Sequence, residues 1–319
     1  MTKLNSYLQV GWAIGDITPK GPVSLHGQYY ERISEGVESP LKVTVLSLES
    51  LDEHGHLEQA IMVSMDLISC PEELHTSLKK LVSKKIPDFD TQKLIINATH
   101  THSAPYPDLE QGYGNFVLET LNNTIITSWN NRKPAGISRT AGYVVVGHNR
   151  RVQYSDGHAE MYGETNRDDF IGLEGPSNSR IELLFLWDSQ KKLTGIIINV
   201  PCPAQISEGK YLISADYWGA VREKIQESIS NDIFIFPQCS ASGDLSPRDL
   251  LHEYNDNEPN MWDFSGVNEI GKRIVDLIED VYSNVSFYIN YKPVFIHKVK
   301  EIKLPTRRIS ETDYKKSLD

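Results

Sequence analysis

Runs typical of strands and runs typical of helices alternate along this chain of 319 residues, and this order limits the folds it can adopt. Apolar or alternating runs indicate strands, and amphipathic runs with a period near 3.6 residues indicate helices. Strands are expected at 10–17, 42–49, 59–65, 94–96, 136–146, 181–187, 193–200, 233–236 and 294–304, and helices at 71–85, 115–130, 214–229 and 262–282. The pattern predicts an α/β fold with a mixed β-sheet core and flanking helices.

The chain is long enough for one large domain or two small ones, and it shows no internal repeat or low-complexity tract. We treat residues 1–319 as a single α/β domain. Residues 310–313 look like the start of a helix, with Ser310 as its cap and only a few residues behind it. A helix start so near the last residue predicts a domain that is shortened at its C-terminus.

Composition argues against several kinds of partner. The chain has 43 acidic and 32 basic residues, a net charge of −11, and no Lys/Arg-rich run, which argues against nucleic acid and anionic membranes. No apolar stretch approaches the roughly 20 residues that a membrane helix needs. The N-terminal residues lack the uninterrupted apolar region of a signal peptide, and the three cysteines form no Cys-x-x-Cys pattern. These features predict a cytoplasmic protein with a small-molecule substrate, and leave its oligomeric state open.

The run from Asn97 to Pro105 contains two histidines, His100 and His102, directly after an expected strand. Residues at i and i+2 on extended backbone point to the same side. A pair of imidazoles placed in this way suits a divalent metal or a proton-transfer site. The alternative is a turn in which hydroxyl-flanked histidines only make hydrogen bonds.

Further candidates follow other expected strands. Asp244 and Ser246 lie in a Gly-Asp-Leu-Ser-Pro run after residues 233–236, where they could act on a ligand or only cap a turn. Asp66 directly follows the expected strand at 59–65 and is either a site residue or the cap of the next helix. Residues 154–179 form a long polar segment that is expected to be a functional loop.

Four short motifs occur in an order that resembles the neutral ceramidase family, in a divergent bacterial-type form. They are Asp16–Pro19, Thr99–Pro105, Asn149–Arg150 and Gly243–Pro247. The resemblance covers most of this chain but only the N-terminal part of the family's catalytic domain. It implies a metal-dependent hydrolase in which zinc-activated water cleaves an amide (N-acyl) or related bond.

The resemblance also implies roles for single residues. His100 would be a zinc ligand, His102 a substrate or oxyanion contact, and Arg150, Asp244 and Ser246 would lie near the scissile amide. Residues 199–205 contain no histidine where the family has its second zinc ligand, and the family's Glu and Tyr ligands come from further along the chain. The possible replacements are His26, Asp66, His148, Cys202 and Asp216.

Two other functions stay open on the sequence alone. The chain could be a catalytically silent relative that binds a ligand without turnover, or a metal-independent hydrolase with Ser246 as nucleophile and His100 or His102 as base. The acidic residues of 154–179 favour a polar substrate, such as a sugar or an amino-acid derivative, over a purely apolar one.

Overall fold

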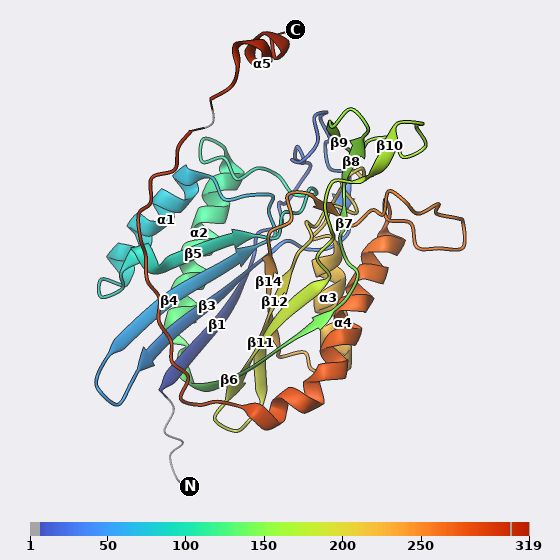
Figure 1. Ribbon diagram of the computed structural model, residues 1–319. Helices are drawn as coiled ribbons and strands as arrows, with labels where there is room; N and C mark the ends of the chain where they lie inside the picture. The colour runs from blue at the N-terminus through green and yellow to red at the C-terminus, as the bar shows by residue number, and fades with distance from the viewer. Residues whose placement is uncertain (1–6, 307, 319) are drawn as a thin grey trace.

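A mixed eight-stranded sheet forms the centre of the computed structural model, which describes residues 7–306 and 308–318. Its strand order is β14-β12-β11-β6-β1-β3-β4-β5 (Figure 1). The bounds are β1 (Leu8–Asp16), β3 (Lys42–Leu51), β4 (Leu57–Met65), β5 (Leu94–Ala98), β6 (Lys133–Tyr143), β11 (Arg180–Asp188), β12 (Leu193–Val200) and β14 (Phe234–Cys239). The pairs β4–β5 and β12–β14 are parallel and the other neighbours are antiparallel. The predicted α/β fold with a mixed sheet is confirmed.

Four helices cover one face of this sheet: α1 (Glu72–Lys85), α2 (Gly112–Asn130), α3 (Tyr217–Ser228) and α4 (Phe264–Val285) (Figure 1). α2 lies close to β1 because Gly11 has no side chain: a Cβ there would lie 2.0 Å from the carbonyl oxygen of Ser128. At the other half of the sheet, Ile274 and Ile278 of α4 share a buried core with Phe185 of β11. None of the helices in the described part of the chain is long and apolar enough to cross a bilayer.

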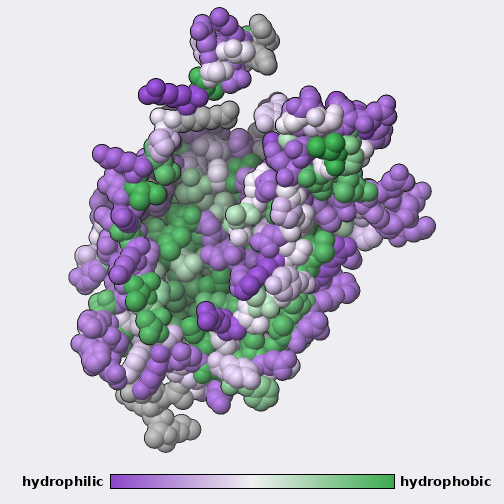
Figure 2. Space-filling model, in the orientation of Figure 1, coloured by the Kyte–Doolittle hydropathy of each residue, from purple (hydrophilic) through white to green (hydrophobic). Residues whose placement is uncertain are grey.

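The opposite face of the sheet is also apolar. Its buried side chains include Leu46, Leu48, Leu186 and Ile197. A hollow of about 430 Å³ lies over this face and is bordered by residues 293–295. Figure 2 shows the apolar side chains gathered in this hollow, with hydrophilic residues around it.

The strand predicted at 294–304 was wrong. This segment runs in extended form without strand pairing, and the side chain of Val294 is 88% exposed. Residues 293–295 border the hollow on a face of the sheet, where no strand edge is available for pairing. The alternating sequence of 294–304 nevertheless resembles that of a strand. Alternation alone therefore could not decide between a paired strand and an unpaired extended segment.

The sheet curls so that its two ends meet. Asn97 in β5 donates from Nδ2 to the carbonyl oxygen of Pro237 in β14 over 3.0 Å, and Ser64 in β4 donates to the same oxygen over 2.6 Å. Adjacent strands rotate by roughly 20–25°, so eight strands accumulate a rotation of roughly 150°. The end strands β5 and β14 are antiparallel when followed from strand to strand along the sheet. The accumulated rotation turns them so that they run in similar directions where the two ends meet. As a result, the loops after β5, β12 and β14 converge.

Smaller elements complete the fold. A three-stranded sheet has the order β10-β8-β9, and two two-stranded pairs are β13-β2 and β15-β7. Their bounds are β2 (Gly36–Val37), β7 (His148–Asn149), β8 (Arg151–Tyr154), β9 (Ala159–Met161), β10 (Phe170–Leu173), β13 (Leu212–Ile213) and β15 (Leu245–Ser246). Single turns are η1 (Thr91–Lys93) and η2 (Ser286–Tyr288).

Two further predictions concern these smaller elements. The prediction that 154–179 is one long loop was wrong in part, because β9 and β10 pair with β8 inside it. The helix start predicted at 310–313 is confirmed by α5 (Glu311–Lys316), where Oγ of Ser310 accepts from the backbone N–H of Asp313.

Candidate functional site

A pocket of about 730 Å³ lies where the loops after β5, β12 and β14 meet. The polar side chains that line it include His26, Gln28, Tyr29, Tyr30, His102, Arg150, Tyr162, Gln205, Glu208 and Arg248. The hollow on the sheet face has mainly aliphatic walls, with Arg139 and Glu182 among its few charged residues. The pocket, which gathers titratable groups from several loops, is therefore the candidate site.

The loop after β5 does not follow the extended path that the sequence predicts. β5 ends at Ala98, and His100 has a φ of +63°, in the left-handed region. This turn lets the backbone N–H of His100 donate to the carbonyl of Leu67 and lets Nδ1 donate to the carbonyl of Ile68 over 2.8 Å. The rings of His100 and His102 still meet edge to face, with their centroids 5.0 Å apart.

Buried hydrogen bonds fix this loop against its neighbours. Arg32 is fully buried and donates to the carbonyl oxygens of His26, His102 and Lys210 at 3.1, 2.6 and 3.0 Å. The hydroxyl of Thr101 donates to the carbonyl of Ser214 over 2.7 Å. Because these partners come from separate loops, the backbone around His102 is held from several sides.

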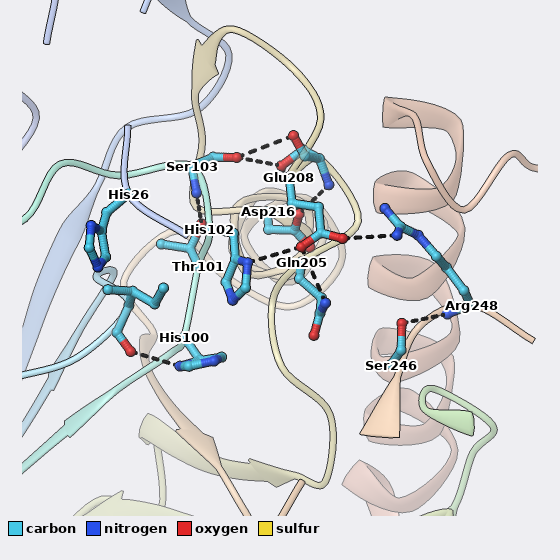
Figure 3. Close-up of polar contacts among 12 residues, drawn as sticks. His26, His100, Thr101, His102, Ser103, Gln205, Glu208, Asp216, Ser246 and Arg248 are labelled. Carbon is cyan, nitrogen blue, oxygen red and sulfur yellow. Dashed lines mark hydrogen bonds and ion pairs between the residues drawn. The ribbon is translucent and has the colours of Figure 1, made fainter. Parts of the chain in front are cut away.

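Glu208 lies between His102 and Arg248 (Figure 3). Its Oε2 is 2.9 Å from Nδ1 of His102, and its Oε1 is 2.9 Å from Nη1 of Arg248. The contact with His102 is close but not well aligned as a hydrogen bond, and Nε2 of the ring is buried without a partner among the described residues. The side chain of Glu208 is only 7% exposed, so this carboxylate acts on both neighbours with little screening by solvent.

Arg150 and Gln205 form the adjoining wall. Nη1 of Arg150 donates to the hydroxyl of Tyr162 over 3.2 Å, and its Nη2 donates to the carbonyl of Gly243 over 2.8 Å. Gln205 donates from Nε2 to the same Tyr162 hydroxyl over 2.8 Å. Tyr162 thus connects a cationic side chain with a neutral amide at the pocket wall.

The environment shifts the pKa values of two site groups. Burial by itself would raise the pKa of Glu208, but the contact with His102 and the charge of Arg248 outweigh it and hold this pKa below its usual value. Burial lowers the pKa of His100, although the hydrogen bond to Ile68 opposes that effect. Near neutral pH, Glu208 is therefore a carboxylate and His100 a neutral imidazole.

Asp244 and Ser246 have structural contacts outside the pocket lining. Oδ2 of Asp244 accepts from Asn149, and its carbonyl accepts from the backbone N–H of Arg150. Ser246 is fully buried in β15, and its hydroxyl accepts from the backbone N–H of Arg248 over 3.3 Å. These contacts place the two arginine-bearing segments, and a direct role at the scissile bond stays a prediction for both residues.

The residues fit a zinc ion only in part. His100 fits, because a metal-binding histidine typically donates its other ring N–H to a carbonyl, as Nδ1 does here. Cys202 does not, because its buried thiol lies against the carbonyls of Val146 and Pro203 and burial raises its pKa. Across the described residues, no group of three or more His, Cys, Asp or Glu side chains is placed to hold a metal ion. These residues do not form a complete zinc site.

The other replacement ligands are also engaged or remote. Asp66 accepts two hydrogen bonds from Arg222, so its interpretation as a helix cap was wrong; the helix begins after Pro71 without a side-chain cap. Asp216 caps α3. Nδ1 of His148 lies 3.5 Å from Oδ2 of Asp249. Of the five possible replacement ligands, only His26 lines the pocket.

Sequence reasoning singled out His102 and Arg150, which line the pocket, but not Glu208 and Arg248, which line it as well. Glu208 lies in an aperiodic segment after β12, with no motif around it. Arg248 directly follows the Gly-Asp-Leu-Ser-Pro run, which was the only available signal. Their proximity to His102 depends on the curl of the sheet, which no local pattern encodes.

Comparison with known proteins gives the fold a precedent. No protein-family model and no curated protein sequence matches the chain. The crystal structure of neutral ceramidase from Pseudomonas aeruginosa is similar over 88% of this chain, with a TM-score of 0.72 and 18% identity. A ceramidase in complex with C2 is similar over the same share, with a TM-score of 0.69 and 17% identity.

This chain spans less than half of each of those proteins, 46% and 44% of their lengths. At such low identity the likeness concerns the fold. The resemblance predicted from the four short motifs is thereby confirmed at the level of structure: residues of this chain adopt the fold seen in neutral ceramidases.

Proposed function

We propose that this chain is a hydrolase that cleaves an amide (N-acyl) or related bond of a small molecule bound in the pocket. The observation that carries the proposal is the contact between His102 and Glu208 inside a pocket that also contains Arg150. The ceramidase-like fold supports the same type of reaction.

His102 would act as the general base. Glu208 lies against Nδ1 and favours the tautomer that carries the proton there, which leaves the unpartnered Nε2 to accept a proton from water. Attack of this water on the carbonyl carbon forms the new C–O bond. The imidazolium then returns the proton to the leaving nitrogen as the C–N bond breaks, so the products are a carboxylic acid and an amine.

Arg150 would stabilise the developing negative charge on the carbonyl oxygen. Its Nε is buried and has no hydrogen-bond partner within the described residues, whereas its Nη atoms are held by Tyr162 and Gly243. A donor that is fixed in advance stabilises the transition state without reorganisation.

The metal-dependent form of the reaction rests on the sequence resemblance and on His100 alone. Zinc would lower the pKa of bound water and polarise the carbonyl if a complete set of ligands were available. Because the described residues supply only part of such a set, the mechanism above is assigned to the side chains of this chain.

A second candidate is ligand binding without turnover. The observation that favours it is that, among the described residues, the side chains that could bind a metal do not come together in a group of three. This candidate predicts saturable binding in the pocket and no chemical change of the ligand.

The test is the release of amine from a panel of N-acyl amides that differ in head group, followed with an amine-reactive dye. Each substrate is assayed with no addition, with a chelator and with added zinc. Amine release that is insensitive to the chelator supports general-base hydrolysis by His102. Release only with zinc would favour the metal-dependent form, and binding without release under all three conditions would favour the silent relative.

A further inference from the structure

The lining of the pocket has more positive than negative charge, although the whole chain carries a net charge of −11. Of the described residues that line it, the fully charged ones are Arg150, Arg248 and Glu208. The single carboxylate contacts Arg248 and His102 but not Arg150, so one of the two guanidinium charges has no counterpart within the lining. A singly charged anion would restore the balance.

Arg248 lines this space and has donor atoms that no described residue engages. Nη1 contacts Glu208, whereas no described residue accepts a hydrogen bond from Nε or Nη2, and Nε is buried. A buried donor without a partner is costly and usually indicates a missing ligand or water. The Nε and Nη2 atoms of one guanidinium match the two oxygens of a carboxylate in a bidentate pair.

Aromatic contacts hold the guanidinium of Arg248 in place. Its Cζ lies 4.9 Å from the ring centre of Trp262 and 5.8 Å from that of Tyr162. Trp262 is 42% exposed, and Met161, which lines the same pocket, is 47% exposed, so the pocket also offers an accessible apolar surface. A ligand that combines an anionic group with an apolar body would satisfy both features.

We propose that the substrate carries a carboxylate near its scissile amide, as in an N-acyl amino acid, and that Arg248 receives this carboxylate through its Nε–Nη2 edge. The inference rests on the proposed hydrolysis and adds the chemical class of the substrate. The apolar acyl group lies along Trp262 and Met161, and the amide lies next to His102 and Arg150. A carboxylate fits better than a phosphate monoester because the uncompensated charge of the lining is single.

Binding is measured by titration calorimetry in His102→Gln protein, so that turnover does not interfere. The ligands are N-octanoylglycine, its neutral analogue N-octanoylethanolamine and the phosphate ester of that analogue. A charge-assisted bidentate contact predicts that the carboxylate binds roughly tenfold or more tightly than the neutral analogue. Arg248→Met should remove this preference, and Arg248→Lys should restore only part of it.

The control is Arg180→Met, which removes an exposed arginine paired with Glu182 and should leave the preference intact. Melting curves establish that each variant is folded. Equal affinity for the carboxylate and neutral ligands, or a preference for the phosphate ester, would overturn the proposal. If N-octanoylglycine binds as expected but the wild-type protein does not cleave it, the substrate class stands and the proposed hydrolysis fails.

Discussion

Replacement of Glu208 by Gln tests how the pocket is held together. The substitution keeps the size of the side chain and removes the charge that lies 2.9 Å from both His102 and Arg248. It leaves a guanidinium that is only 12% exposed without its ionic partner. We therefore expect a loss of stability as well as a loss of activity.

The magnitude follows from burial. Removing one partner of a buried ion pair typically costs about 3–5 kcal/mol, and the amide of Gln keeps part of the hydrogen bonding, so we expect about 2–3 kcal/mol. At roughly 2–4 °C per kcal/mol, the melting temperature should fall by about 4–12 °C. Misorientation of the base His102 should reduce kcat by a factor of about 100 or more.

The stability effect should depend on pH. The pKa of Glu208 in the fold lies below its ordinary value of 4.5. Its charged form therefore stabilises the fold fully above about pH 4.5, and this contribution is lost as the pH falls through the lowered pKa. The difference in melting temperature between the wild type and Glu208→Gln should accordingly be present at pH 7 and shrink in acid.

A double-mutant cycle with Arg248→Met measures how strongly Glu208 and Arg248 stabilise one another. If the two side chains stabilise one another, the double variant should lose about 1–3 kcal/mol less stability than the sum of the single losses. Glu227→Gln, an exposed position on α3, is the matched control and should change neither stability nor activity. Strict additivity, or a Glu208→Gln protein as stable and as active as the wild type, would refute the reasoning.

Three further predictions concern the scaffold of the site and the chemistry around it. Gly27→Ala should lower activity and stability, because Gly27 has a φ of +115° and a Cβ there would lie 2.7 Å from Cβ of His102. A crystal structure would show the displacement of His102 and melting curves the loss of stability, whereas a variant as stable and active as the wild type would contradict this. The pKa of Cys70 is raised by burial to about 11, so its alkylation should be slow at pH 8 and accelerate about tenfold per pH unit up to pH 10; a plateau near pH 9 would count against this. Arg222→Met should destabilise the fold by about 3–5 kcal/mol in denaturant titrations, because it leaves the fully buried carboxylate of Asp66 without its cationic partner. A loss below about 1 kcal/mol would show that the ion pair is dispensable.

The sequence was sufficient for the order of the main elements, because period and punctuation are local properties. Each expected helix and strand of the central sheet is present in the structure within a few residues. The exception, residues 294–304, shows the limit of that reasoning: an alternating run becomes a strand only where a sheet edge is free to pair with it.

The site was predicted in part for a related reason. His102 and Arg150 belong to recognisable motifs, and the structure brings both into the lining of one pocket. Glu208 and Arg248 were missed because their importance comes from contacts across the curled sheet and not from their neighbours in sequence. Extended backbone was also the wrong expectation for His100, whose positive φ depends on carbonyls of a different loop.

The most direct test of the proposed function compares amide hydrolysis by the wild type, His102→Gln and His54→Gln. His54 is an exposed histidine remote from the pocket lining and serves as the control. If His102 is the general base, the wild type and His54→Gln release amine from an N-acyl substrate, and folded His102→Gln does so at a rate at least about 100-fold lower. A His102→Gln protein that releases amine at the wild-type rate would contradict that role.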